Sequence, residues 1–434
     1  MSPILRLAGL LTTGAGRDSR TPTILSVIGF SVSTAALLTS LGGLHAFTQH
    51  FRPGTDAAAL YQVLAVTAVA LLVVPILTLG SLAARVTVTR RDARLAALRL
   101  AGATSGQVTL LTLLEAAAQA LFGAVLGAAV YVMAVPALGQ LRFDGRVLGP
   151  DHVLTPPLWI LGVVVGVVVL AVGSGVGSLG RVVVSPLGVA QRSRAGAVSA
   201  LRLGLTALAL LAFLVATKGS TGAGIGVLLL TLVGLVGSIN LAGPWVVQLC
   251  GRLMARRASR ATTLLAARRI VDDPRATWRS VSALGLGLII AATAGGFAAT
   301  ARDHPDPTLP HLGTDVLTGA AIALVITALV AATATGVAQA GRIYDQRPQY
   351  AALVLAGASM RTLDRARLIE CLAPLVGSLA LASGFAVSIQ LVAGQVPDAT
   401  VLLPMIAAGI VALGLTLAAV LASTGLVRQL SQAA

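Results

Sequence analysis

Long apolar runs dominate this chain of 434 residues. A helix of about 20 apolar residues crosses the roughly 30 Å of hydrocarbon in a bilayer. None of the runs alternates polar and apolar residues as the strands of a membrane barrel do. Because lipid offers the backbone no hydrogen-bond partners, we expect an all-α polytopic membrane protein with ten transmembrane helices. The runs lie at about 22–48, 58–84, 108–135, 156–180, 199–217, 223–247, 279–300, 315–340, 366–392 and 400–425.

The composition and the placement of charge support this assignment. Hydrophobic residues make up 56% of the chain and charged residues 11%, too few to coat a water-soluble globule. With ten spans, 26 of the 31 Lys and Arg residues fall on the side that holds both termini, which the positive-inside rule makes the cytoplasm. Orientation and anionic lipids then account for the net charge of +16, so no nucleic-acid partner is expected.

One motif occurs twice, 255 residues apart. The first copy reads Ala-Ala-Leu-Arg-Leu-Ala-Gly-Ala-Thr at 96–104 and is followed by Glu115. The second reads Ala-Ala-Leu-Val-Leu-Ala-Gly-Ala-Ser at 351–359 and is followed by Glu370, the one other glutamate in the sequence. The copies are six spans apart, an even number, so we predict two parallel four-helix repeats joined by two extra spans.

The repeat predicts five segments. An amphipathic cytoplasmic stretch comes first, a four-span repeat follows, two linking spans and a basic cytoplasmic stretch come next, and a second four-span repeat ends the chain. Their bounds are 1–21, 22–198, 199–247, 248–278 and 279–434, with a short cytoplasmic helix at about 88–103 in the first repeat and at about 345–358 in the second.

The first short helix has the features of a joint between the membrane surface and a span. Leu95 and Leu98 share one face of residues 90–99, and four arginines lie elsewhere in the segment. Gly102 suits the left-handed position that ends a helix, and Thr104 or the serine after it suits the N-cap of the next span. Such a unit would deliver a push on the short helix to the span. The alternative is an ordinary interfacial helix whose arginines reach the lipid headgroups.

The second short helix repeats this arrangement with different residues. Pro348 suits the first helical turn, and Tyr350 and Leu353 form the apolar face. Gly357 is placed to end the helix, and Ser359 to cap the following span.

The two glutamates lie where a carboxylate is costly. Glu115 comes eleven residues after Thr104, about 16 Å along a helix. A charge at that depth costs at least about 2.5 kcal/mol unless it faces protein or finds a partner, so we expect it to face the bundle. The sequence leaves open a structural hydrogen bond, through Gln119 for example, a role in transmitting motion, and a substrate or proton site.

The five histidines fall at or beyond the outer face of the predicted membrane. Asp303, His304, Asp306, His311 and Asp315 could form a divalent metal site or a pH-sensitive patch. Their spacing matches no specific ligand pattern, so we expect solvated loop residues and no metal site.

Small residues crowd two of the spans, at 123–127 and at 162–177. Such residues allow helices to pack closely. Small residues are equally compatible with positions that face lipid and pack against no other helix, so both interpretations stay open.

These motifs resemble the FtsX/MacB-like permease family of ABC transporters. The hallmark of that family is an arginine-rich segment that leads into Leu-x-x-x-Gly-Ala-(Ser/Thr) and then a membrane glutamate. The ten-span layout without a large outer domain is similar to the bacitracin-export type of permease, and residues 185–190, Ser-Pro-Leu-Gly-Val-Ala, are also similar to the family.

The resemblance implies that the two short cytoplasmic helices are coupling helices that dock on an ABC ATPase subunit. By position this role falls on Arg91, Arg94, Leu95, Leu98 and Gly102, and on Arg347, Tyr350, Leu353 and Gly357. The sole lysine, Lys218, follows Thr217, so no P-loop is present and the chain is not expected to be an enzyme. ATP and Mg would bind to the partner, no catalytic residue or cofactor is expected here, and two coupling helices in one chain match an ATPase dimer.

The expected function is that of a permease subunit in a bacterial plasma membrane. Its substrate would be amphipathic or lipid-like, such as an antimicrobial peptide, a lipid-linked molecule or a lipoprotein, and the short outer loops favour uptake from the bilayer. One alternative is a secondary transporter that uses Glu115 and Glu370 to carry protons. Another is a non-transporting signalling subunit that works with a sensor kinase or another membrane partner.

Overall fold

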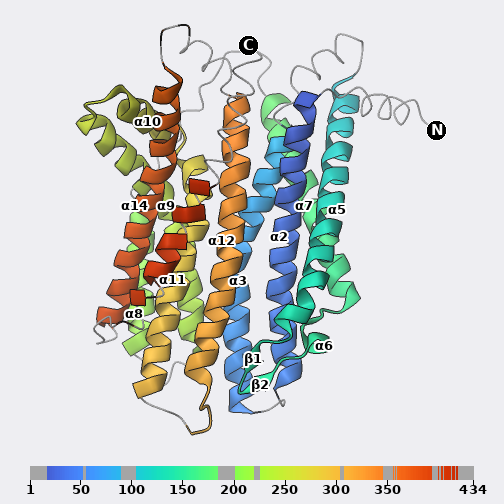
Figure 1. Cartoon of the computed structure of the whole chain (residues 1–434), viewed down its shortest axis with the longest axis vertical. Coiled ribbons are helices and arrows are strands. Elements are labelled where there is room, and N and C mark those ends of the chain that lie inside the picture. Colours follow the sequence, from blue (N-terminus) through green and yellow to red (C-terminus); the bar gives the residue numbers. More distant parts are fainter. Residues whose placement is uncertain are drawn as a thin grey trace, which may run out of the picture.

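Long helices run side by side along one axis in the computed structural model (Figure 1). Eight of the described helices are long and apolar enough to cross a membrane, and shorter apolar helices lie at 204–213 and 405–415. The all-α polytopic membrane fold is confirmed, and the count of ten spans stays a prediction. The structure describes residues 17–51, 55–88, 104–183, 201–218, 225–303, 307–345, 359–392 and most of 399–418, with Leu355 and Gly357.

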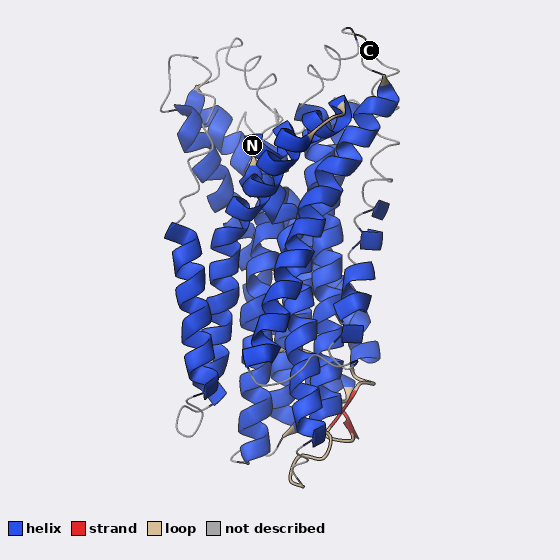
Figure 2. Ribbon diagram, turned by 90° about the vertical axis from the view of Figure 1, so that its left-hand side faces the viewer, coloured by secondary structure: helices blue, strands red, loops and turns tan. Residues whose placement is uncertain are grey.

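The first half of the chain contributes four long helices and a small cap at one end of the bundle, which is called the outer end and the outer cap after the predicted orientation. The long helices are α2 (Arg17–His50), α3 (Asp56–Val88), α5 (Ser105–Leu138) and α7 (Pro157–Val183). The cap joins α5 to α7 and consists of β1 (Arg142–Phe143), β2 (Arg146–Val147) and α6 (Pro150–Val153). The two strands pair antiparallel, and Figure 2 shows them at one end of the bundle.

The second half adds six further helices among the described residues. They are α8 (Leu201–Lys218), α9 (Ile225–Arg257), α10 (Ala261–Asp272), α11 (Pro274–Asp303), α12 (Leu312–Asp345) and α14 (Met360–Val392). The basic stretch predicted at 248–278 is divided among the end of α9, all of α10 and the start of α11. The short helix α10 lies at the end of the bundle opposite the strands, beside α14 (Figure 1).

The same three-helix unit occurs in both halves. A shift of 255 residues brings α2 onto α11, α3 onto α12 and α5 onto α14, and the first residues of α5 and α14, Ser105 and Met360, differ by that number. In each half the first helix packs against the other two, α2 on α3 and α5, and α11 on α12 and α14. The halves meet where α12 packs against α3 and α2, so the counterpart helices α3 and α12 lie close to the approximate symmetry axis.

Helix α11 is the centre of the bundle. Of its most apolar window, 89% is buried inside the protein, against 28–50% for the other candidate spans. It packs against α9, α12 and α14 and also contacts α3 from the first half. Apolar side chains of both halves share one core around it, among them Leu79 of α3, Leu288 of α11 and Leu375 of α14. A shift of α11 would therefore change the packing of side chains in both halves.

The structure separates the two glycine-rich stretches by what they face. A Cβ added at Gly127 would lie 2.3 Å from the carbonyl oxygen of Ser31, and one added at Gly123 would lie 2.7 Å from Cβ of Phe30. These two glycines of α5 therefore allow α2 to approach its backbone. An added Cβ at Gly162 or Gly166 of α7 would meet nothing within 4 Å, so these positions are open.

This contrast gives a matched pair of substitutions. Gly127→Ala should destabilise the protein by about 1–3 kcal/mol, because the added methyl group forces α2 away from α5. Gly166→Ala should leave stability unchanged or raise it slightly, because alanine favours helices and the site is open. Thermal unfolding of both variants in the same detergent measures the difference, and equal melting temperatures would contradict the close α2–α5 packing.

Candidate functional site

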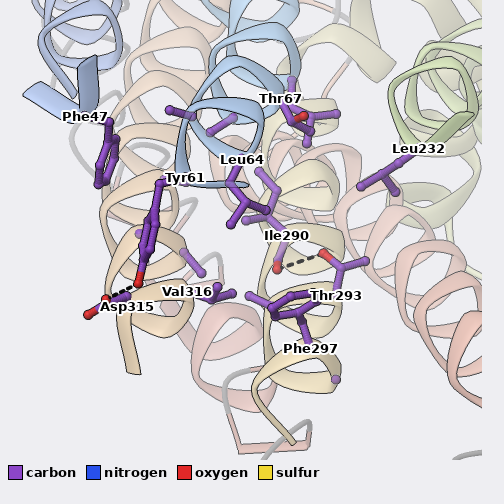
Figure 3. Close-up of a pocket in the computed structure, with 18 of the residues that line it drawn as sticks. Phe47, Tyr61, Leu64, Thr67, Leu232, Ile290, Thr293, Phe297, Asp315 and Val316 are labelled. Atoms are coloured by element: carbon purple, nitrogen blue, oxygen red, sulfur yellow. Dashed lines mark hydrogen bonds between the residues drawn. The ribbon is translucent and has the colours of Figure 1, made fainter. Parts of the chain in front are cut away.

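A cavity of about 440 Å³ lies between the two halves of the bundle (Figure 3). Its walls come from α2 and α3 of the first half, α11 and α12 of the second, and the helix pair α8 and α9. Most lining side chains are apolar, such as Leu64, Leu232 and Ile290, and the volume falls in the range of ligand sites. A second cavity of about 100 Å³ adjoins it and shares Phe47 and Phe143 with it.

Aromatic residues gather at this cavity, although they make up only 3% of the chain. Four of the eight phenylalanines and one of the four tyrosines line it: Phe47, Phe143, Phe213, Phe297 and Tyr61. Phe47 and Phe143 meet edge to face with ring centroids 4.9 Å apart, and Phe51 stacks on Tyr61 at 4.3 Å. These rings give the outer end of the cavity a rigid apolar wall.

Asp315 is the one charged residue among those that line the cavity. Only 5% of its surface is exposed, and it lies in the first turn of α12. The Tyr61 hydroxyl donates to its Oδ2 at 2.5 Å, and the backbone N–H of Asp144 donates to the same oxygen at 2.8 Å. This carboxylate therefore ties α12 of the second half to α3 and to the β1–β2 hairpin of the first.

The hairpin reaches Asp315 because of its turn. Asp144 and Gly145 have φ of 52° and 70°, the left-handed values of a two-residue type I′ turn, and Asp-Gly is a preferred pair there. Tyr131 of α5 holds the cap in place. Its hydroxyl donates to the carbonyl of Val153 at 2.6 Å and accepts from the N–H of Thr155 at 3.0 Å. The cap thus holds the turn, and the Asp144 N–H with it, against α12.

The expectation that Asp315 is a solvated loop residue is wrong. It lies inside α12 and is buried, because the hairpin and α3 cover it. Position 315 is the counterpart of 60 under the 255-residue shift, one residue from Tyr61, so the near-symmetric packing of α3 on α12 brings the two together. Among the described residues, no group of three or more His, Cys, Asp or Glu side chains could hold a metal ion.

The cavity can hold an apolar ligand that carries a small polar group. The threonine hydroxyls in its wall bond within their own helices, as Thr293 does to the carbonyl of Ile290 (Figure 3) and to that of Ile289. They present little polarity to an occupant. Both hydrogen bonds to Asp315 end on Oδ2. Among the lining residues, the Asp315 carboxylate is the charged group that a ligand in this apolar, aromatic cavity would meet.

At the opposite end of the bundle, Thr104 is the N-cap of α5. Its φ and ψ are −71° and 153°, its hydroxyl accepts from the N–H of Gln107, and the Gln107 side chain accepts from the N–H of Thr104. This reciprocal capping box satisfies two free donors at the helix start. It joins the chain that enters α5 firmly to the first turn of the helix.

The start of α14 has a related arrangement. The Ser359 hydroxyl accepts from the N–H of Thr362 at 3.3 Å, and Gly357 has φ of 89°, a left-handed value that glycine adopts without strain. Both features were expected from the motif. The other residues predicted to couple to an ATPase lie outside the described residues: Arg91, Arg94, Leu95, Leu98, Gly102, Arg347, Tyr350 and Leu353.

The two glutamates have different surroundings. Glu115 lies on α5 and is half-buried. Glu370 on α14 is 5% exposed, and its Oε2 lies 3.5 Å from Nη1 of Arg269 on α10. The motif did not predict Arg269 as a partner, because that residue precedes Glu370 by about a hundred positions in a segment assigned only by its basic character.

One segment of the chain matches a known protein family. The FtsX-like permease C-terminal family matches residues 64–186. Residues 64–186 are therefore similar to an FtsX-like permease domain, in agreement with the resemblance seen in the motifs. The match begins in α3, continues through the predicted coupling segment 88–103, Glu115 and the outer cap, and ends beyond α7. It supports a membrane subunit with a permease-type role, of the kind that works with an ABC ATPase. No curated protein matches the chain.

The Asp315 node makes a prediction that does not depend on a substrate. Tyr61→Phe and Asp315→Asn should each destabilise the protein, and the double variant should lose less than the sum, with a coupling energy of about 1–3 kcal/mol. Asp151→Asn, an exposed carboxylate of α6 at the same end, is the control and should have no effect. Thermal unfolding measures all four, and additive losses at 61 and 315 would contradict the shared hydrogen bond.

Proposed function

We propose that this chain is the permease subunit of an ABC transporter. It couples ATP hydrolysis by a separate ATPase dimer to the movement or extraction of an amphipathic or lipid-like substrate in a bacterial plasma membrane. The observation that carries the proposal is the FtsX-like match at 64–186, which covers one copy of a motif that the chain carries twice. A second copy at 351–359 would provide the second ATPase contact.

The proposed transmission begins at the two cytoplasmic segments. Closure of the ATPase dimer around ATP would bring residues 88–103 and 345–358 together. Each segment leads directly into a long helix, α5 after Thr104 and α14 after Ser359. Because the capping contacts fix these helix starts, a displaced segment tilts its helix rather than bending the connection.

Packing would carry this tilt to the cavity. Helix α5 packs on α2 through Gly123 and Gly127, and α14 packs on α11. Phe47 of α2 and Ile290, Thr293 and Phe297 of α11 line the cavity from opposite halves. Movement of α5 and α14 toward each other would therefore change the distance between two of the cavity walls.

The lining of the cavity supports a lipid-like substrate. An acyl chain or a comparable apolar group would be surrounded by aliphatic and aromatic side chains, and the Asp315 carboxylate would favour a polar group that donates hydrogen bonds or carries positive charge. The outer cap is a two-stranded hairpin and one short helix. Entry from the bilayer suits such a chain better than capture in water.

The proton-coupled alternative receives less support. Glu370 forms a buried ion pair with Arg269, which favours a role in joining helices over a role in carrying protons. A signalling subunit would use the same cytoplasmic segments and differs only in whether a solute moves.

The experiment that tests the proposal is purification of tagged chain from its native membrane, followed by assay of the complex in nanodiscs. An ABC ATPase should be recovered with the chain, and lipid-like compounds should stimulate its ATP hydrolysis. Recovery without an ATPase would overturn the permease assignment. Stimulation by water-soluble peptides alone would overturn the lipid-like substrate.

Proline substitutions test the coupling segments. Gly357→Pro should leave membrane insertion intact and lower substrate-stimulated ATP hydrolysis to the unstimulated rate, because proline cannot adopt the φ of 89° at this position. Gly102→Pro should act alike in the first copy. Ser105→Pro and Met360→Pro are the controls, since the first helical position accepts proline. Normal stimulation in both glycine variants would contradict the coupling role.

A further inference from the structure

The short helix α10 is held tightly against its neighbours. Ala266, Ala267 and Ile270 are buried, whereas Arg268 on the same helix is exposed. Its partner α9 has Gly251 at the contact, where an added Cβ would lie 2.9 Å from Val271 and 3.0 Å from Ile270. Helix α10 also packs on α14 (Figure 1).

One ion pair joins α10 to α14. The Arg269 and Glu370 side chains are 9% and 5% exposed, and Nη1 and Oε2 lie 3.5 Å apart. A charge this deeply buried needs compensation, and removing one member of a buried ion pair is costly because the other charge stays buried without that partner. The pair therefore fixes the position of α10 along α14. Apolar contacts define this position less precisely, because they have no preferred direction.

Helix α10 is joined to the central helix by one residue. It ends at Asp272, Asp273 follows, and α11 begins at Pro274. The Asp273 side chain accepts from the N–H of Ala276 at 3.0 Å, and its backbone carbonyl accepts from the Thr277 hydroxyl at 2.9 Å. A displacement of α10 is thus delivered to α11, whose far half lines the cavity at Ile290, Thr293 and Phe297.

We propose that Arg269 and Glu370 are positioning residues that link α14 to α11 through α10. The inference rests on the proposed function, since α14 follows the second coupling segment. It assigns the buried glutamate of the second repeat to transmission of motion. Under the 255-residue shift the counterpart of Arg269 is Gly14, so the arginine of this pair is not repeated at the equivalent position of the sequence.

The first test uses the full chain alone in nanodiscs, without an ATPase. A reporter cysteine, Thr293→Cys, lines the cavity, and its labelling rate by a membrane-permeant maleimide is read by peptide mass spectrometry, so that Cys250 and Cys371 stay in place. Arg269→Gln and Glu370→Gln should each change this rate by about threefold or more, and the double variant by no more than either single one. Arg269→Lys should restore most of the wild-type rate, and exposed Arg268→Gln should leave it unchanged. Wild-type rates in both single variants, or additive changes in the double variant, would overturn the proposal.

The second measurement covers variants that fold poorly. Because both variants remove the same ion pair, the loss of stability in Arg269→Gln/Glu370→Gln should be smaller than the sum of the two single losses. Losses that add in the double variant would overturn the pairing. Neither measurement needs a nucleotide or a partner. Failure to recover an ATPase would therefore count against the proposed function and leave these results to decide the linkage on their own.

Discussion

The cost of polar groups in an apolar bundle shapes this protein more than any other constraint. Only 11% of the residues are charged, and lipid offers a charged side chain no partner. Each buried carboxylate must therefore find its partner within the protein, and each partner fixes two helices relative to each other. Asp315 does so for α12, α3 and the hairpin, and Glu370 does so for α14 and α10.

These two carboxylates lie at opposite ends of the second half and have complementary effects. Asp315 joins the halves at the outer end of the cavity, and Glu370 joins elements of one half at the coupling end. Between them runs α11, the most buried of the candidate spans, whose core contacts are largely apolar although Trp278 donates to Asn240 and the Ser280 carbonyl accepts from Thr335. An arrangement with fixed polar contacts at the ends and apolar packing in the middle allows helices to move as rigid bodies, because apolar surfaces slide at lower cost than paired charges separate.

The sequence predicted the features that depend on local chemistry. The apolar runs, the repeat and the helix starts at Ser105 and Met360 follow from spacing, capping and glycine stops, and the resemblance to the FtsX-like family follows from one motif. The cavity, the burial of Asp315 and the Arg269–Glu370 pair depend on how α3 meets α12 and how α10 folds back on α14. Those contacts join residues up to 254 positions apart, and no local pattern encodes them. For the Tyr61–Asp315 contact, the repeat was the available signal. Asp315 is the counterpart of position 60, and near-symmetric packing of α3 on α12 brings it close to Tyr61.

The most direct test of the account is the distance between the two halves at the outer end as the nucleotide state changes. Spin labels at Gln49→Cys on α2 and Arg302→Cys on α11, both exposed, report the distance between the cavity walls that hold Phe47 and Phe297, and the unsubstituted chain gives the background from native cysteines. In the purified complex, addition of a non-hydrolysable ATP analogue should shift the distance distribution between these labels. An identical distribution with and without nucleotide, in a complex that hydrolyses ATP, would contradict the claim that force from the cytoplasmic segments reaches the cavity.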